Sequence, residues 1–254
     1  MRHLQILALI GSTKDHSSNY KLVKFLKGLA MQPGFGESQK DSTPNGDKTK
    51  DLQAKLSAEA LIHWNTFPIS GLPFFDPDLD KPIDGSDITD APSTPKPQYI
   101  NDPKRDLDHN HRFEKQSDEG MPVSRVPTVV QQLREKVAAA DAVIICSPEY
   151  VFSLPGILKN ALEWLVATTV LSEKPMALII AAASGDKAKE SLELIVKTLG
   201  GKFTDKTSIR IRGIAGKFDS NGQLTDPEAI ASLQQLLFAL KALILTDFKE
   251  DKLI

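Results

Sequence analysis

The loop from Gly11 to Asn19 contains the residue types that bind phosphate groups. It follows an apolar run and precedes a helical pattern, so its N–H groups and hydroxyls should gather at a helix N-terminus, where an anion is favoured. The alternative is that Ser17 or Ser18 only caps that helix. The loop has neither a G-x-G-x-x-G pattern nor the length of a Walker loop. The candidate phosphate-binding residues are Gly11, Ser12, Thr13, Lys14, Ser17, Ser18 and Asn19.

A second candidate loop follows the apolar run 142–146, which is typical of a buried parallel strand. Open α/β sheets bind ligands at the carboxyl ends of such strands. An aromatic side chain there supplies a flat apolar wall, and the N–H groups of a tight turn can meet the polar edge of a ring. The alternative for the two aromatic residues is ordinary core packing. The candidate ligand-binding residues are Pro148, Glu149, Tyr150, Val151 and Phe152.

The elements that position these loops are predicted by hydrophobic periodicity. Strand-like apolar runs alternate with stripes of helical spacing, which indicates right-handed βαβ units and a doubly wound parallel sheet. The expected strands are 3–10, 60–66, 141–146, 176–183 and 207–212. The expected helices are 18–30, 128–140, 155–168, 187–199 and 227–245.

Two polar segments interrupt this alternation, at approximately 31–57 and 81–126. Both carry prolines and charges without an apolar period, so they are predicted to be surface insertions. The second carries six prolines and cannot bury enough apolar surface to form a core. The whole chain, 1–254, is therefore predicted to be one domain with two insertions.

Composition narrows the possible partners. The formal net charge of −2 argues against nucleic acid or an anionic membrane as a partner. No apolar run approaches the roughly 20 residues that span a bilayer, and the first residues favour a strand over a secretory signal. The single cysteine, Cys146, excludes an internal disulfide, suits a cytoplasmic location and is expected to be a small buried hydrophobe.

Other chemistries find no support. The alternation of Asp76, Asp78 and Asp80 lacks the glycine of a calcium loop, because Lys81 and Pro82 follow, so no metal site is predicted. No G-x-S-x-G elbow is present, which argues against a hydrolase triad.

The segment 147–164 resembles the Pro-Glu-Tyr…Pro-Gly-x-Leu-Lys-Asn-Ala…Trp signature of NAD(P)H-dependent FMN reductases, a flavodoxin-like family. The first loop resembles the family's Gly-Ser-x-Arg-x-x-Ser-x-Asn phosphate loop, with Lys14 in place of arginine. Val151 stands where the family commonly has asparagine. The resemblance covers approximately 3–30, 58–80 and 127–246.

This resemblance implies a five-stranded parallel sheet of order 2-1-3-4-5 that binds FMN at the carboxyl ends of strands one, three and four. Ser184 and Gly185 match the family's small-residue loop, where the backbone approaches the flavin ring. Hydride would pass from NAD(P)H to FMN and then to a small-molecule acceptor such as a quinone, free flavin, azo compound or metal oxyanion, with no catalytic side chain. The assembly implied is a homodimer or homotetramer. The competing class is a non-enzymatic flavodoxin-like electron carrier or interaction module.

Overall fold

The computed structural model describes residues 2–14, 16–31, 60–80 and 125–250. The chain divides into two units, Met1–Phe75 with Pro127–Ile254, and Asp76–Val126. The first unit holds the sheet and its helices. The expected insertions at 31–57 and 81–126 lie almost wholly outside the described residues and stay predictions.

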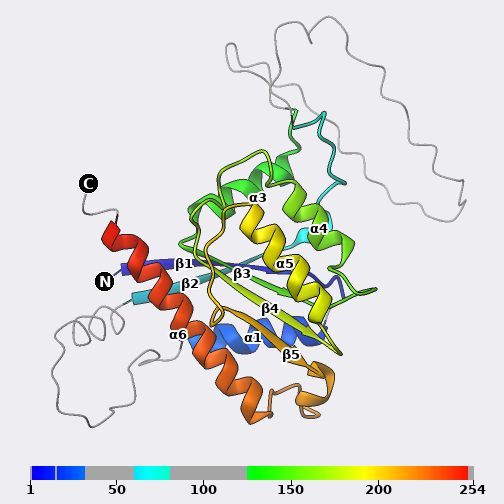
Figure 1. The fold of residues 1–254 in the computed structure, drawn as a ribbon, viewed down its shortest axis with the longest axis vertical. Helices are drawn as coiled ribbons and strands as arrows, with labels where there is room; N and C mark the ends of the chain where they lie inside the picture. Colours follow the sequence, from blue (N-terminus) through cyan, green and yellow to red (C-terminus); the bar gives the residue numbers. More distant parts are fainter. Residues whose placement is uncertain (1, 15, 32–59, 81–124, 251–254) are drawn as a thin grey trace, which may run out of the picture. The chain divides into compact units, whose positions relative to one another are not determined.

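Five parallel strands form one sheet in the order β2-β1-β3-β4-β5 (Figure 1). This arrangement confirms the predicted flavodoxin-like topology. Neighbouring carboxyl ends meet at one edge, since Ile10 of β1 pairs with Cys146 of β3, and Ser147 pairs with Ile180 of β4. The strands are β1 Arg2–Ile10, β2 Ala60–Phe67, β3 Ala142–Ser147, β4 Met176–Ala182 and β5 Ser208–Arg212.

The helices begin where the sequence pattern predicts, but α4 ends earlier. It was expected over 155–168 and ends at Glu163, because the chain tightens into i→i+3 bonds such as Leu165 N to Leu162 O. The β-branched run that follows, from Val166 to Val170, has low helix propensity. The described helices are α1 Ser18–Ala30, α3 Thr128–Ala139, α4 Gly156–Glu163, α5 Asp186–Thr198 and α6 Pro227–Glu250, with short 3₁₀ turns η1 Ile69–Gly71 and η2 Ile214–Lys217.

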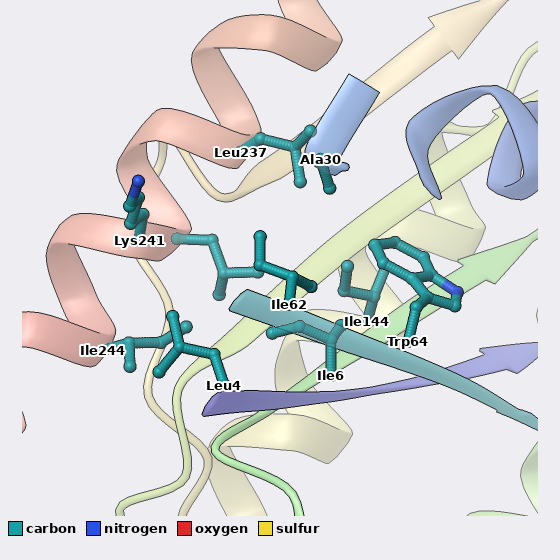
Figure 2. Close-up of a pocket in the computed structure, with 10 residues that line it drawn as sticks. Leu4, Ile6, Ala30, Ile62, Trp64, Ile144, Leu237, Lys241 and Ile244 are labelled. Atoms are coloured by element: carbon teal, nitrogen blue, oxygen red, sulfur yellow. The ribbon is translucent and has the colours of Figure 1, made fainter. Parts of the chain in front are cut away.

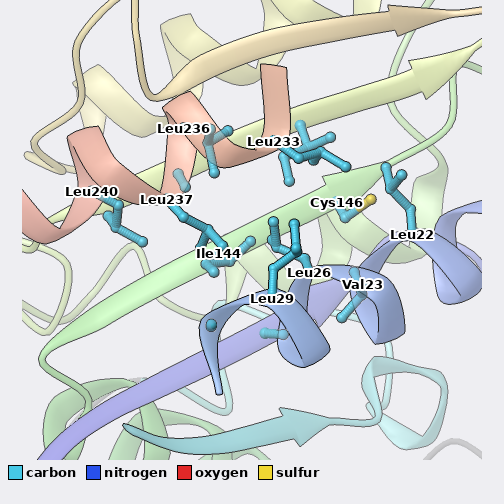
Figure 3. Packing of buried hydrophobic residues seen from close by; sticks show 14 of the residues in the cluster. Leu22, Val23, Leu26, Leu29, Ile144, Cys146, Leu233, Leu236, Leu237 and Leu240 are labelled. Carbon is cyan, nitrogen blue, oxygen red and sulfur yellow. The ribbon is translucent and has the colours of Figure 1, made fainter. Parts of the chain in front are cut away.

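Each face of the sheet has its own apolar core. Leucines of α1 and α6 pack on Ile144 and Cys146 from one side, as Figure 3 shows. Helices α3, α4 and α5 cover the other side, where they meet Val143 and Ile145. The period-2 alternation of side chains along β3 sends its residues to both cores, which is why the strand reads as a continuous apolar run.

Helix α6 departs from the expectation that no apolar run approaches membrane-spanning length. Its stretch Pro227–Thr246 has a mean hydropathy of 1.6 and is long and apolar enough, by length and composition alone, to cross a membrane. A core helix meets the same criterion, and Leu233, Leu240 and Ile244 are buried against the sheet. Packing on the sheet explains the apolar residues on this face of α6.

A small apolar cavity of about 30 Å³ lies where α6 crosses the amino-terminal halves of β1 and β2 (Figure 2). Leu4, Ile62 and Leu237 are among its lining residues, and burial lowers the pKa of the Lys241 ammonium at its margin. A void of this size holds about one water molecule. It is too small for a cofactor, so the ligand site is to be sought at the carboxyl edge.

Candidate active site at the carboxyl edge of the sheet

The loop after β1 presents its polar groups at the N-terminus of α1. Ser12 is half-buried, Thr13 and Lys14 are exposed, and the Lys14 N–H donates to Ser12 Oγ over 3.4 Å. Ser17 caps α1 by accepting a hydrogen bond from the Tyr20 N–H (3.1 Å). The capping alternative is thus correct for Ser17, and Ser18 is the first residue of the helix. The first turn of α1 contains no acidic residue.

Gly11 is required by a close approach of strands. Its N–H donates to the Cys146 carbonyl (2.8 Å), and a Cβ at Gly11 would lie 2.5 Å from Ser147 Oγ and 3.1 Å from Leu158 Cδ2. Real Cβ atoms do not tolerate the first distance. Gly11 therefore acts through packing, which lets the first loop lie directly beside the loop after β3.

The Asn19 side chain differs from its predicted role. It is 4% exposed, its Nδ2 donates to the Ala181 carbonyl (3.1 Å), and its Oδ1 accepts from the Cys146 thiol (3.2 Å). This amide ties α1 to β3 and β4, so its side chain cannot contact a phosphate. Cys146 is fully buried in the core, as predicted, and this burial raises the pKa of its thiol.

The loop after β3 forms a tight, projecting turn. Tyr150 and Ser153 exchange two backbone hydrogen bonds of 2.9 and 3.0 Å around Val151 and Phe152, whose φ angles are +51° and +56°. Positive φ at both central residues is the pattern of a type I′ turn, which favours asparagine and glycine. Val151 is 96% and Phe152 77% exposed, so the aromatic residues are not core residues. The turn presents a rigid apolar tip.

Glu149 joins two loops instead of pointing outward. Its carboxylate accepts hydrogen bonds from the N–H groups of Gly185 (3.1 Å) and Ala188 (3.0 Å), at the start of α5. The pKa of the Glu149 carboxyl is lowered, chiefly by the Ala188 N–H and also by that of Gly185, although partial desolvation opposes the shift. The predicted ligand contact of Glu149 is thus replaced by a cap on α5, and only its backbone is left to line a site. Pro148, before it, is buried and its carbonyl accepts from the Ser147 hydroxyl (2.9 Å).

The loop after β4 is held by charges. Gly185 has φ +92°, and a Cβ there would lie 2.8 Å from Ile180 Cγ2, so glycine is needed. Asp186 is the first residue of α5, after the N-cap residue Gly185. Its carboxylate pairs with Arg210 and, at 2.9 Å, with Arg212, and it accepts a hydrogen bond from Ser184 Oγ (3.0 Å).

This arginine pair was missed at the level of sequence. Both arginines belong to β5, two residues apart, and therefore share a face of the strand. The period-2 spacing was the available signal. It could not reveal the partner, because Asp186 lies 24 residues earlier in the chain than Arg210.

Asn160 of α4 and Trp164, which follows the helix, fix the segment after η1. Asn160 accepts from the Phe75 N–H (2.7 Å) and donates to the Pro73 carbonyl (2.9 Å), which also accepts from Trp164 Nε1 (2.9 Å). Phe75 packs edge-on against the Trp164 ring. Trp164 is fully buried within its own fold, so it supplies no apolar surface to an interface.

The donors at this edge fit a phosphorylated ring compound. The helix N-terminus, the Lys14 ammonium and the hydroxyls of Ser12 and Thr13 suit a phosphate. The exposed rings of Tyr150 and Phe152 suit the flat part of such a ligand. Within the described ranges, no group of three or more His, Cys, Asp and Glu side chains is placed to hold a metal ion.

Comparison with known proteins gives consistent results. The family model for NADPH-dependent FMN reductases matches residues 99–211, which include the loops after β3 and β4 but not the loop after β1. The chain is 36% identical over 124 residues to an NAD(P)H:quinone oxidoreductase of Solanum tuberosum, covering 47% of this chain and 64% of that protein. It is 31% identical over 139 residues to the NADH:(hydroxy)cinnamate reductase subunit CrdA of Vibrio ruber, covering 51% of this chain and 68% of that protein. The aligned part thus spans just under two thirds of the Solanum tuberosum protein.

Among solved structures, the chain is similar to FerB, a flavoenzyme NAD(P)H:(acceptor) oxidoreductase from Paracoccus denitrificans. The TM-score is 0.58 at 19% identity, covering 96% of this chain and 98% of that one. At this identity the likeness concerns the fold alone.

Proposed function

Because this chain belongs to the NADPH-dependent FMN reductase family, we propose that it is an NAD(P)H-dependent flavin oxidoreductase that binds FMN at the carboxyl ends of β1, β3 and β4. The observation that carries the proposal is the meeting of three loops at one edge of the sheet. One loop offers charge and hydroxyls, one offers exposed aromatic rings, and one offers a glycine backbone. These groups match the phosphate and the ring of FMN.

When bound, FMN supplies the redox chemistry by accepting a hydride from reduced nicotinamide and passing electrons to an acceptor. The residues of this chain bind and orient. Lys14, Ser12 and Thr13 hold the phosphate, and the turn at Tyr150–Ser153 supplies an apolar wall. Glu149 keeps that turn in register with the loop after β4 through its bonds to Gly185 and Ala188. No side chain has to move a proton, so an open ring face is the main requirement.

We propose a quinone as the acceptor class, with azo compounds as the second class. Relatives of this chain carry these names: an NAD(P)H:quinone oxidoreductase, and an NADPH azoreductase of Bacillus sp. that is 34% identical over 76 residues. A hydrophobic ring acceptor also fits the exposed apolar tip of the β3–α4 loop. Free flavin and metal oxyanions are less apolar and gain less from that surface.

The test is reconstitution of the full chain with FMN. Flavin binding is followed by the change in its visible absorbance, and turnover by NADPH or NADH oxidation with menadione as acceptor. We expect a yellow protein that oxidises at least one nicotinamide over many turnovers when menadione is present. A yellow protein inert to both nicotinamides would instead make it an electron carrier.

We also propose that the protein is a cytoplasmic homodimer or homotetramer. Val151, Phe152 and Val166 are exposed apolar side chains that a second subunit could cover, and the single buried cysteine suits a reducing compartment. Light scattering at micromolar concentration should give a multiple of 27.8 kDa. A species of the monomer mass alone contradicts this assembly, and fractionation of expressing cells tests the location.

A further inference from the structure

A groove of about 470 Å³ lies between α1 and the turn that precedes α6. It is far larger than the cavity under α6 and falls in the size range of small-molecule sites. We call it the cationic groove. Its lining residues are His16, Tyr20, Lys21, Lys24, Phe25, Gly28, Leu29, Asn221, Gly222 and Gln223.

The described residues that line this groove include two cations and no acid. Lys21 and Lys24 supply the positive charge. Helix α1 itself has no Asp or Glu between Ser18 and Ala30. The nearest acid in the turn, Asp219, is directed into its own loop, where it accepts from the N–H groups of Asn221 (2.9 Å) and Gln223 (2.8 Å). The groove therefore favours an anion.

One of the lysines is held in place. The Lys21 ammonium lies 5.7 Å from the centre of the Phe218 ring, a cation–π arrangement. A Cβ at Gly222, where φ is +76°, would lie 3.5 Å from Lys21 Nζ. The Lys21 side chain thus lies against the wall formed by Phe218 and Gly222, whereas the Lys24 side chain is exposed to solvent.

The groove begins where the proposed phosphate loop ends. His16 precedes Ser17, and the Tyr20 N–H is bonded to Ser17 Oγ (3.1 Å). Its walls also offer the aromatic rings of Tyr20 and Phe25 and the exposed amide residues Asn221 and Gln223. Rings that stack, amides that recognise a base edge and cations for a phosphate are the requirements of an adenosine phosphate.

We propose that the cationic groove binds the adenosine-phosphate part of FAD, so that the chain accepts FAD as well as FMN at the same phosphate loop. This inference rests on the proposed flavin site, because the two flavins share the ring and the first phosphate. The second phosphate would lie near Lys21 and Lys24. The adenine would lie between Tyr20 or Phe25 and the amides of the 219–223 turn.

The experiment compares two lysines of the same helix. Lys24→Ala removes a charge from the groove, and Lys27→Ala removes an exposed charge that does not line it. Dissociation constants of FMN, FAD and ADP are measured by calorimetry for the wild type and both variants. A charge-assisted contact is worth about 1.5–3 kcal/mol, and an exposed one less, so we expect about a fivefold weaker binding of FAD and ADP by Lys24→Ala. FMN binding by both variants, and all binding by Lys27→Ala, should change less than twofold.

Each outcome decides between the two proposals. If FAD and FMN respond identically to Lys24→Ala, the adenosine part lies outside the groove and the inference is overturned. If neither flavin binds but ADP does so in a Lys24-dependent manner, the proposed function fails while the groove keeps its ligand class. An effect of Lys24→Ala on the KM for NADPH, without one on FAD affinity, would assign the groove to the nicotinamide dinucleotide and overturn the FAD assignment.

Discussion

The loop after β1 and the loops after β3 and β4 meet at the same edge of the sheet but use their polar groups differently. In the first loop, Thr13 and Lys14 are exposed, and Ser12 Oγ accepts one long hydrogen bond from the described part of the loop. In the other two loops, the carboxylates have partners inside the protein. Glu149 accepts from backbone N–H groups at the start of α5, and Asp186 pairs with the arginines of β5. What those loops present outward is apolar, in the exposed side chains of Val151 and Phe152.

The contrast suggests how the site divides its work. A loop with uncommitted donors binds charge, and loops with satisfied polar groups hold a fixed apolar shape. The proposed ligand has the same two ends, a phosphate and a flat ring. Variants of the first loop should therefore affect affinity, and variants of the others should affect stability.

The largest effect is expected from the first loop. Replacing Ser12 and Lys14 together by alanine removes a hydroxyl donor and an ammonium, each contact being worth about 1.5–3 kcal/mol. We expect FMN affinity to fall at least tenfold while the unfolding midpoint of the apoprotein stays unchanged. Lys27→Ala, a lysine of α1 away from the loop, is the control. An unaltered dissociation constant in the double variant would place the phosphate elsewhere.

Gly11 should behave as a packing residue although it belongs to the charge-binding loop. The Cβ of Gly11→Ala would overlap Ser147 Oγ, and overpacking of this kind costs about 1–3 kcal/mol. Gly28→Ala is the matched control, since nothing lies within 4 Å of its Cβ. Gly28 lies in the last turn of α1, where alanine should stabilise the helix by up to about 0.5–1 kcal/mol. Urea denaturation of both variants measures this, and equal shifts in one direction would contradict it.

Glu149 should contribute stability that depends on pH. Glu149→Ala leaves the N–H groups of Gly185 and Ala188 without their acceptor, and loss of a helix cap costs about 0.5–2 kcal/mol. Because the pKa of the folded state is lowered, the contribution is complete above the unfolded value of about 4.3 and is lost as the pH falls through the folded value. The difference in the free energy of unfolding between wild type and variant should therefore become smaller below about pH 4.3.

A matched control is Glu190→Ala on α5, the helix whose N-terminus Glu149 caps. Glu190 forms an exposed pair with Lys187, and such pairs contribute about 0–1 kcal/mol. Denaturation curves across the acidic range compare the two variants. A gap for Glu149→Ala that stays constant through that range would show that the carboxylate charge is unimportant.

The smallest effect is expected at the tip of the turn after β3. Val151 has a φ of +51°, and this left-handed conformation costs a non-glycine residue about 1–2 kcal/mol. Val151→Asn should therefore stabilise the protein by about 1 kcal/mol, because asparagine tolerates it better. Val166→Asn, at an exposed valine without positive φ, should change stability by less than about 0.5 kcal/mol. If both substitutions shift the melting temperature equally, strain at Val151 is not the cause.

The fold was predictable because its signals are local. The apolar runs of β1, β3 and β4 are buried on both faces, and the stripes of α1, α3 and α5 keep the helical period without interruption. The end of α4 was less predictable, since the apolar pattern continues beyond Glu163 whereas Trp164 is bound to the distant Pro73. The membrane-length hydropathy of α6 was not predicted, because polar residues interrupt its apolar residues and leave no continuous apolar run.

The candidate site was predictable in position but not in detail. Strand ends and a helix cap locate the loops, whereas the partner of each side chain depends on contacts between distant segments. Asn19 and Glu149 illustrate this, because each matches a ligand-binding motif, yet the side chain of each forms hydrogen bonds to other parts of the protein. The residues around Glu149 in the sequence do not indicate that its carboxylate caps α5, because that helix begins far along the chain.

Because Cys146 is buried, the rate at which this single cysteine reacts with thiol reagents reports on unfolding. Thiol reagents attack the thiolate, and here the raised pKa and complete burial withhold it from them. Since β3 lies in the centre of the sheet, a reagent can reach this sulfur only when the core itself opens. The rate at which the native protein is alkylated therefore measures how often the whole sheet comes apart, with no label added to the chain.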